Sequence, residues 1–218
     1  MKIYYLIPNN ERPSWGLAMV YQHVQLLNKN GFEAFIVKET QTLPSWLEVN
    51  VPVLNFEGFK KKMKKSDYLI VPEVMMNFKG LKKIDCKKIV FIQAGGYIFE
   101  SMPPGEDHAS LGFTHTWIIM PHLKKIVEKH IKLPYTLIPP FIAEYFFIDN
   151  LYAKKKKQIL LYPKFQQIDY SIVKYLLTKY IEKNNGTVMK QFFTKENWKI
   201  IELKNLTHKE VAKEMQRS

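Results

Sequence analysis

The sequence predicts an α/β protein with a parallel β-sheet, on two patterns and the composition. Short, nearly unbroken apolar runs occur along the chain, as in strands that are buried on both faces of a parallel sheet. Segments with apolar residues at helical spacing lie between these runs. The composition is globular, because 46% of the 218 residues are hydrophobic and 14% are aromatic.

The first 37 residues contain the clearest succession of strand, loop, helix and strand. An apolar run from Lys2 to Ile7 predicts the first strand, and the run from Phe32 to Val37 predicts the second. Between them, apolar residues recur at helical spacing: Leu17, Val20, Val24 and Leu27. Gly31 follows at the position expected for a helix C-terminal cap.

Gly16, where this helix begins, is the first candidate for a binding site. Free backbone N–H groups and the positive end of the helix dipole would face an anion over the preceding loop. The alternative is ordinary turn chemistry, because the chain has neither a G-x-G-x-x-G nor a Walker pattern.

Further apolar runs extend the sheet. They predict strands at 67–73, 87–93 and 116–120, with helices in the lysine-rich segment after Phe56 and at 121–131. The strand that ends at Gln93 runs into the turn Ala94-Gly95-Gly96-Tyr97. Ligands bind beyond the carboxyl ends of strands in open parallel sheets, so this turn is a second candidate wall of a site. The alternative is a plain tight turn whose glycines need a positive φ.

A second α/β unit is predicted beyond Pro139 and Pro140. The two prolines stiffen the exit from the first domain, and a lysine-rich segment then supplies a soluble linker. Strands are expected at 158–162 and 198–203, around a helix at 169–183. Thr207 is expected to cap a last helix, with Glu210 completing a capping box.

The chain is strongly basic, with 33 Lys and Arg against 20 Asp and Glu and a net charge of +13. The lysines gather in two runs, within 60–65 and at 154–157. The simplest interpretation is a solvated helix face and a solvated linker. The alternative is an anionic membrane surface, which attracts such patches. Nucleic acid is not favoured, because no RNP pattern, zinc finger or helix-turn-helix accompanies the charge.

Three segments resemble group-1, family-4-like glycosyltransferases. They are W-G-x-x-x-V-Y at the start of the first helix, L-L-N-K-N-G-F-E-A at its end, and LPYTLIPPFIAEYF around the two prolines. Members of that family carry two facing Rossmann-like domains, the GT-B fold. The resemblance implies an acceptor-side Rossmann-like domain at 1–145, a basic linker at 146–157 and an incomplete donor-side Rossmann-like domain at 158–218.

The resemblance also implies site residues. The acceptor side of the cleft would be formed by Gly16, Gln93, Gly95, Gly96 and Tyr97. Many relatives carry a histidine at the position of Gln93, so the most obvious general base is missing and the catalytic residue is unknown. The family commonly binds the donor diphosphate with an arginine and a lysine after the first strand of the second domain, where this chain offers Lys164.

Neither a metal nor a bound cofactor is expected, apart from the nucleotide-sugar as donor substrate. His108, His115 and His122 are spaced along a segment that Gly112 and Pro121 interrupt, and no D-x-D motif occurs. The single cysteine, Cys86, and the lack of a signal peptide or long apolar segment predict a cytoplasmic protein, with peripheral binding to the inner membrane face as an extension.

The resemblance implies sugar transfer from a nucleotide-sugar to a glycan or lipid-linked acceptor, by metal-independent, retaining chemistry. The resemblance would place a further strand, and then the E-x7-E segment that grips the donor in relatives, after the last predicted helix, and the given sequence stops at Ser218 before them. A truncated, impaired enzyme is therefore expected. The alternative is a non-catalytic basic module that binds a membrane surface or a separately encoded partner chain that completes the second domain.

Overall fold

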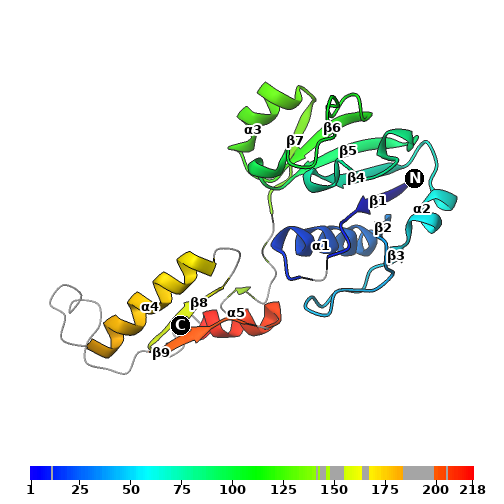
Figure 1. The fold of residues 1–218 in the computed structure, drawn as a ribbon. Coiled ribbons are helices and arrows are strands. Elements are labelled where there is room, and N and C mark those ends of the chain that lie inside the picture. The colour runs from blue at the N-terminus through cyan, green and yellow to red at the C-terminus, as the bar shows by residue number, and fades with distance from the viewer. Residues whose placement is uncertain are drawn as a thin grey trace. The chain divides into compact units, whose positions relative to one another are not determined.

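The computed structural model describes residues 1–10, 12–140, 142, 146–147, 155–163, 167–183, 199–204 and 206–218. The chain separates into two compact units, Met1–Phe141 and Ile142–Ser218 (Figure 1). Each unit is described by itself.

The first unit is built on a seven-stranded sheet in which every neighbouring pair is parallel, in the order β3-β2-β1-β4-β5-β6-β7. Its strands are β1 (Lys2–Leu6), β2 (Glu33–Val37), β3 (Val53–Leu54), β4 (Tyr68–Pro72), β5 (Lys87–Ile92), β6 (Phe113–Ile118) and β7 (Tyr135–Leu137). The predicted α/β class with a parallel, Rossmann-like sheet is confirmed for this unit.

The helices of the first unit lie between the strands along the chain. They are α1 (Trp15–Lys29), α2 (Phe56–Lys62) and α3 (Leu123–Ile126), which continues into a π-helical turn, Val127–Ile131. Three one-turn 3₁₀ segments follow strands or loops: Glu73–Met75, Leu81–Lys83 and Gly95–Tyr97.

The C-terminal end of helix α1 is hydrogen-bonded to strand β2. The Asn28 side chain donates from Nδ2 to the Ala34 carbonyl oxygen (3.0 Å) and accepts the Ala34 N–H at Oδ1 (2.9 Å). Gly31 has φ 81°, so the expected glycine cap is confirmed. The face of α1 that carries Val20 and Val24 is buried, and the central strands are buried around Tyr5, Ile70 and Phe91. This packing fixes where the N-terminus of α1 lies relative to the strand ends.

The second unit contains, within its described residues, a parallel pair of strands, β8 (Gln158–Leu161) and β9 (Lys199–Glu202). Helices α4 (Gln167–Lys183) and α5 (His208–Arg217) accompany them. The predicted capping box is present, because Thr207 Oγ1 accepts the Glu210 N–H and Glu210 Oε2 accepts the Thr207 N–H. A second Rossmann-like domain stays a prediction.

Among the described residues, the helices are too short or too polar to cross a bilayer.

Candidate functional site

The order of the strands singles out the carboxyl ends of β1, β4 and β5. Strand β1 lies between β2 and β4. After β1 the chain passes through α1 to β2 on one side of β1, and it later forms β4 and β5 on the other side. Open α/β sheets bind ligands at such a switch point, beyond the carboxyl ends of the strands. Three segments reach this edge: the start of α1 after β1, Glu73 after β4, and the residues from Gln93 after β5.

The first turn of α1 places backbone N–H groups at this edge. Ser14 is the N-cap residue, with extended φ and ψ of −143° and 130° and no side-chain capping bond. The first N–H that closes a helical bond is that of Ala18, which donates to the Ser14 carbonyl oxygen at 2.9 Å. The N–H groups of Trp15, Gly16 and Leu17 therefore precede the helical ladder and carry the positive end of the helix dipole.

Gly16 and Gln93, two of the predicted site residues, are in direct contact. Gln93 Nε2 donates to the Gly16 carbonyl oxygen at 3.0 Å. A Cβ atom on residue 16 would lie only 2.4 Å from Gln93 Oε1. Gly16 is not in the left-handed region, so turn geometry does not call for a glycine here, but a Cβ would force the flexible end of the Gln93 side chain to shift. The contact joins the end of β5 to the first turn of α1.

The turn after Gln93 is a 3₁₀ segment whose two glycines have different surroundings. A Cβ on Gly95 would lie 3.0 Å from Ile126 Cδ1 and 3.3 Å from Leu123 Cδ2, so this glycine lets the turn pack on α3. Gly96 faces open space, and Tyr97 is 48% exposed. Neither glycine has a positive φ, so a turn that needs a positive φ is excluded. Gly96 and Tyr97 are the accessible members of the predicted set.

Glu73 is a member of this edge that sequence reasoning missed. It follows β4 directly and is only 2% exposed, and its Oε1 accepts the Ala94 N–H at 2.8 Å. Its Oε2 has no hydrogen-bond partner among the residues that the structure describes. Burial raises the pKa of this carboxyl, and nearby backbone N–H groups offset only part of that shift. A carboxyl directly after a buried apolar strand was the available signal, but the pattern assigned Glu73 to the strand itself.

Ser101 fixes the backbone around Glu73. Its Oγ donates to the Glu73 carbonyl oxygen at 2.8 Å and accepts the Met76 N–H at 3.1 Å. The end of β4 is therefore held on both sides, by Ser101 and by the Ala94 N–H. Such support places Glu73 and the turn after β5 in one rigid arrangement.

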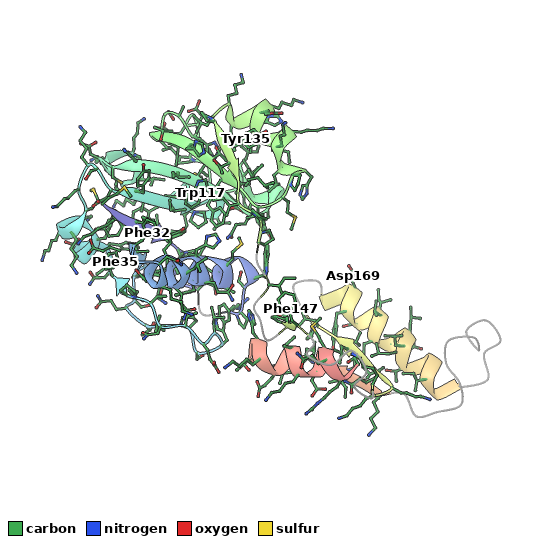
Figure 2. All side chains as sticks on the ribbon, turned by 180° about the vertical axis from the view of Figure 1, so that it is seen from behind. Phe32, Phe35, Trp117, Tyr135, Phe147 and Asp169 are labelled. Carbon is green, nitrogen blue, oxygen red and sulfur yellow. The ribbon has the colours of Figure 1, made fainter. Side chains whose placement is uncertain are left out.

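A neutral histidine lies in the aromatic core beside α1. The His23 ring stacks on Phe91 with centroids 5.5 Å apart and meets the edge of Tyr5 at 6.2 Å. Burial lowers the pKa of His23 to about 4. Trp117, labelled in Figure 2, also packs on Tyr5 and Phe91. His23 is thus an uncharged packing residue at neutral pH.

The three histidines weighed from the sequence occupy separate places. His108 is buried, His115 Nε2 lies 2.8 Å from Thr136 Oγ1, and His122 is exposed before α3. Glu106, in the same loop as His108, pairs with Lys82 at 2.8 Å and accepts from Ser110 Oγ. Within the described ranges, no three His, Cys, Asp or Glu side chains are arranged to hold a metal ion.

Lys164, the predicted donor-diphosphate residue, lies outside the described residues, as does the segment 143–145 after the two prolines. Its role stays a prediction.

Comparison with known proteins gives no family assignment. No protein-family model matches the chain, and no curated protein matches it significantly. The resemblance to glycosyltransferases therefore rests on the short motifs and on the fold class.

Proposed function

We propose that the first unit is the acceptor-binding part of a protein that transfers a sugar from a nucleotide-sugar to a glycan or lipid-linked acceptor. The observation that carries the proposal is the contact of Gln93 with Gly16 at the switch point of the sheet, 3.0 Å from Nε2 to the carbonyl oxygen. It joins two residues that the resemblance assigns to the acceptor side of the cleft.

The chemistry of this edge suits a polyhydroxylated ligand. The first N–H groups of α1 can donate to hydroxyl oxygens, and Gln93 Oε1 can accept from a hydroxyl group. Tyr97 offers an exposed aromatic face with a polar tip, a combination that favours amphipathic ligands such as sugar rings. Glu73 has a raised pKa, so its protonated form persists to higher pH and can also donate a hydrogen bond.

Gln93 itself cannot take a proton from the acceptor, because a side-chain amide is not a general base. The residues of this edge therefore act by binding and orienting the acceptor hydroxyl group. In such transfer, positioning of the two substrates and neutralisation of the leaving diphosphate supply the rate enhancement. The diphosphate role falls to the second unit in this proposal.

The test is glycan binding by the purified full chain, on an oligosaccharide array and then by titration calorimetry with the strongest binder. Gln93→Ala removes both the acceptor oxygen and the link to α1, so we expect at least about tenfold weaker glycan binding. Gly16→Ala should have a similar effect, because the new Cβ displaces the flexible end of Gln93. The fold should remain, with unfolding free energy changed by less than about 1 kcal/mol.

The matched control is Gln25→Ala, which removes a glutamine from the same α1 helix but away from its first turn. It should bind glycans as the unchanged chain does. Transfer is followed in parallel by nucleotide release from UDP- and GDP-sugars with the same oligosaccharide. The proposal is wrong if the chain binds no oligosaccharide and releases no nucleotide, or if Gln93→Ala binds unchanged.

A further inference from the structure

Lysine side chains gather at the opposite, amino edge of the first unit's sheet. Strands β1, β4 and β5 begin there in register, since Ile3 pairs with Tyr68 and Tyr68 pairs with Lys87. Helix α2 ends at the same edge, because the chain passes from α2 directly into β4. The basic edge consists of six lysines: Lys2, Lys61, Lys62, Lys64, Lys65 and Lys87.

A buried aspartate holds these segments together. Asp67 is 1% exposed, and its carboxylate accepts the Lys2 N–H at Oδ1 (2.7 Å) and the Lys64 N–H at Oδ2 (2.9 Å). Its carbonyl oxygen accepts the Lys87 N–H at 3.0 Å. Hydrogen bonds to Asp67 therefore connect the backbone segments that carry Lys2, Lys64 and Lys87. The basic edge is thus part of the folded sheet.

The ammonium groups of three of these lysines lie over aromatic rings. Lys2 Nζ and Lys62 Nζ lie 5.7 and 5.9 Å from the centroid of Phe35, and Lys87 Nζ lies 5.1 Å from that of Tyr68. Two carboxylates share the edge, Glu33 with Lys2 at 3.5 Å and Asp85 with Lys65 at 3.4 Å. With the Asp67 carboxylate included, six cations still face three anions.

Exposed apolar side chains accompany the charge. Met1 is 69% exposed and Phe32 is 49% exposed. Phe32 immediately precedes Glu33, the register partner of Lys2, so it lies at the same edge. Figure 2 labels Phe32 and Phe35 on this side of the first unit. Lysines next to exposed Met and Phe form a surface that is both cationic and able to enter an apolar phase.

We propose that the basic edge binds the surface of an anionic phospholipid membrane. Acidic headgroups attract each nearby lysine, while apolar and aromatic side chains gain by entering the interface. Met1 and Phe32 favour a membrane over nucleic acid, because phosphate binding alone makes no use of exposed apolar side chains. This inference is independent of the proposed function, whose residues lie at the other end of the strands.

The experiment is co-sedimentation of the full chain with vesicles of phosphatidylcholine, alone or with about one third phosphatidylglycerol. The chain should bind only the anionic vesicles, and the binding should weaken as salt rises from about 50 to about 500 mM. The triple variant Lys61→Gln, Lys62→Gln, Lys64→Gln should bind them on the order of 100-fold more weakly. Phe32→Ser should weaken binding several-fold without changing the net charge.

A matched control keeps the change in charge and moves it to α3 and the turn that follows. Lys124→Gln, Lys125→Gln, Lys129→Gln removes three exposed lysines there and should bind within about twofold of the unchanged chain. Circular dichroism and urea unfolding establish that both triple variants fold. Equal loss in the two triple variants, binding to pure phosphatidylcholine, or tight binding to duplex DNA or RNA without vesicle binding would each overturn the proposal.

Discussion

Gly16 shows at the scale of one residue how a site position differs from its sequence pattern. A glycine at the start of a helix after a strand suggested an anion cradle or a turn. The structure shows a different constraint, since a Cβ there would lie 2.4 Å from Gln93 Oε1 and the Gln93 side chain would have to move. That partner is 77 residues away in the sequence, so no local pattern could have predicted the contact.

The buried Glu73 carboxyl should make the free energy of unfolding depend on pH. Burial raises its pKa in the folded chain above the ordinary value of 4.5, so the folded state keeps the proton more tightly than the unfolded state. Its contribution to stability is therefore complete below that value and is lost as pH rises through the raised pKa. The Glu73→Gln variant has no carboxyl to titrate at this position, so this loss of stability with rising pH should not occur. Its side-chain amide oxygen can still accept the Ala94 N–H.

The measurement is the free energy of urea unfolding for the unchanged chain and Glu73→Gln between about pH 4 and pH 8. The stability of the variant relative to the unchanged chain should rise with pH. His23, whose lowered pKa of about 4 acts in the opposite direction, is present in both proteins and cancels in the comparison. A difference that stays constant across the range would contradict a raised pKa of Glu73. Glu57→Gln, at an exposed glutamate, is the control for replacing a glutamate by glutamine.

At the scale of the element, α1 and strands β1, β2, β4 and β5 were predictable. Strand β3 was not predicted, the strand expected at 116–120 lies at Phe113–Ile118, and the ends of the later helices were not predictable. The lysine run predicted a helix through 65, but α2 ends at Lys62 and Met63 is extended. The cause is Asp67, which takes the Lys64 N–H that a longer helix would need. The predicted helix at 121–131 is likewise a short α-helix followed by a π-helical turn, closed by Lys132 at φ 57°.

Removal of the Asp67 carboxylate should destabilise the first unit. Asp67→Ala leaves two backbone N–H groups without their charged acceptor at the junction of β1, β4 and the loop after α2. We expect a loss of about 3 kcal/mol in the free energy of unfolding. Asp85→Ala is the control, because its carboxylate pairs with an exposed lysine and should matter by less than about 1 kcal/mol. Equal losses in urea unfolding would show that Asp67 does not organise this edge.

At the scale of the whole first unit, one parallel sheet separates two surfaces. The carboxyl edge carries α1's first turn, Glu73 and Gln93, and the amino edge carries the six lysines around Asp67. Strands of five or six residues set the two edges roughly 17 to 20 Å apart. A membrane at the amino edge would thus lie on the opposite side of the sheet from the carboxyl edge, where we propose acceptor binding.

The fold class was predictable because buried parallel strands leave apolar runs that can be read locally. The site was predictable in part, since the ends of apolar runs located Gln93 and the start of α1. Glu73 was missed because the apolar pattern assigned it to the strand itself. The contact of Glu73 with Ala94 and the basic edge were not predictable, because both depend on which strands become neighbours, and no single segment of the sequence determines the strand order.

Acceptor binding at the carboxyl edge of the sheet is tested most directly by amide hydrogen exchange of the full chain, with and without the oligosaccharide that binds most strongly on the array. If the carboxyl edge binds the acceptor, exchange should slow at 15–17 and 94–97 and remain unchanged at 61–65 on the amino edge. Protection confined to other segments, with no change at 15–17 or 94–97, would contradict the placement of the acceptor site at this edge of the sheet.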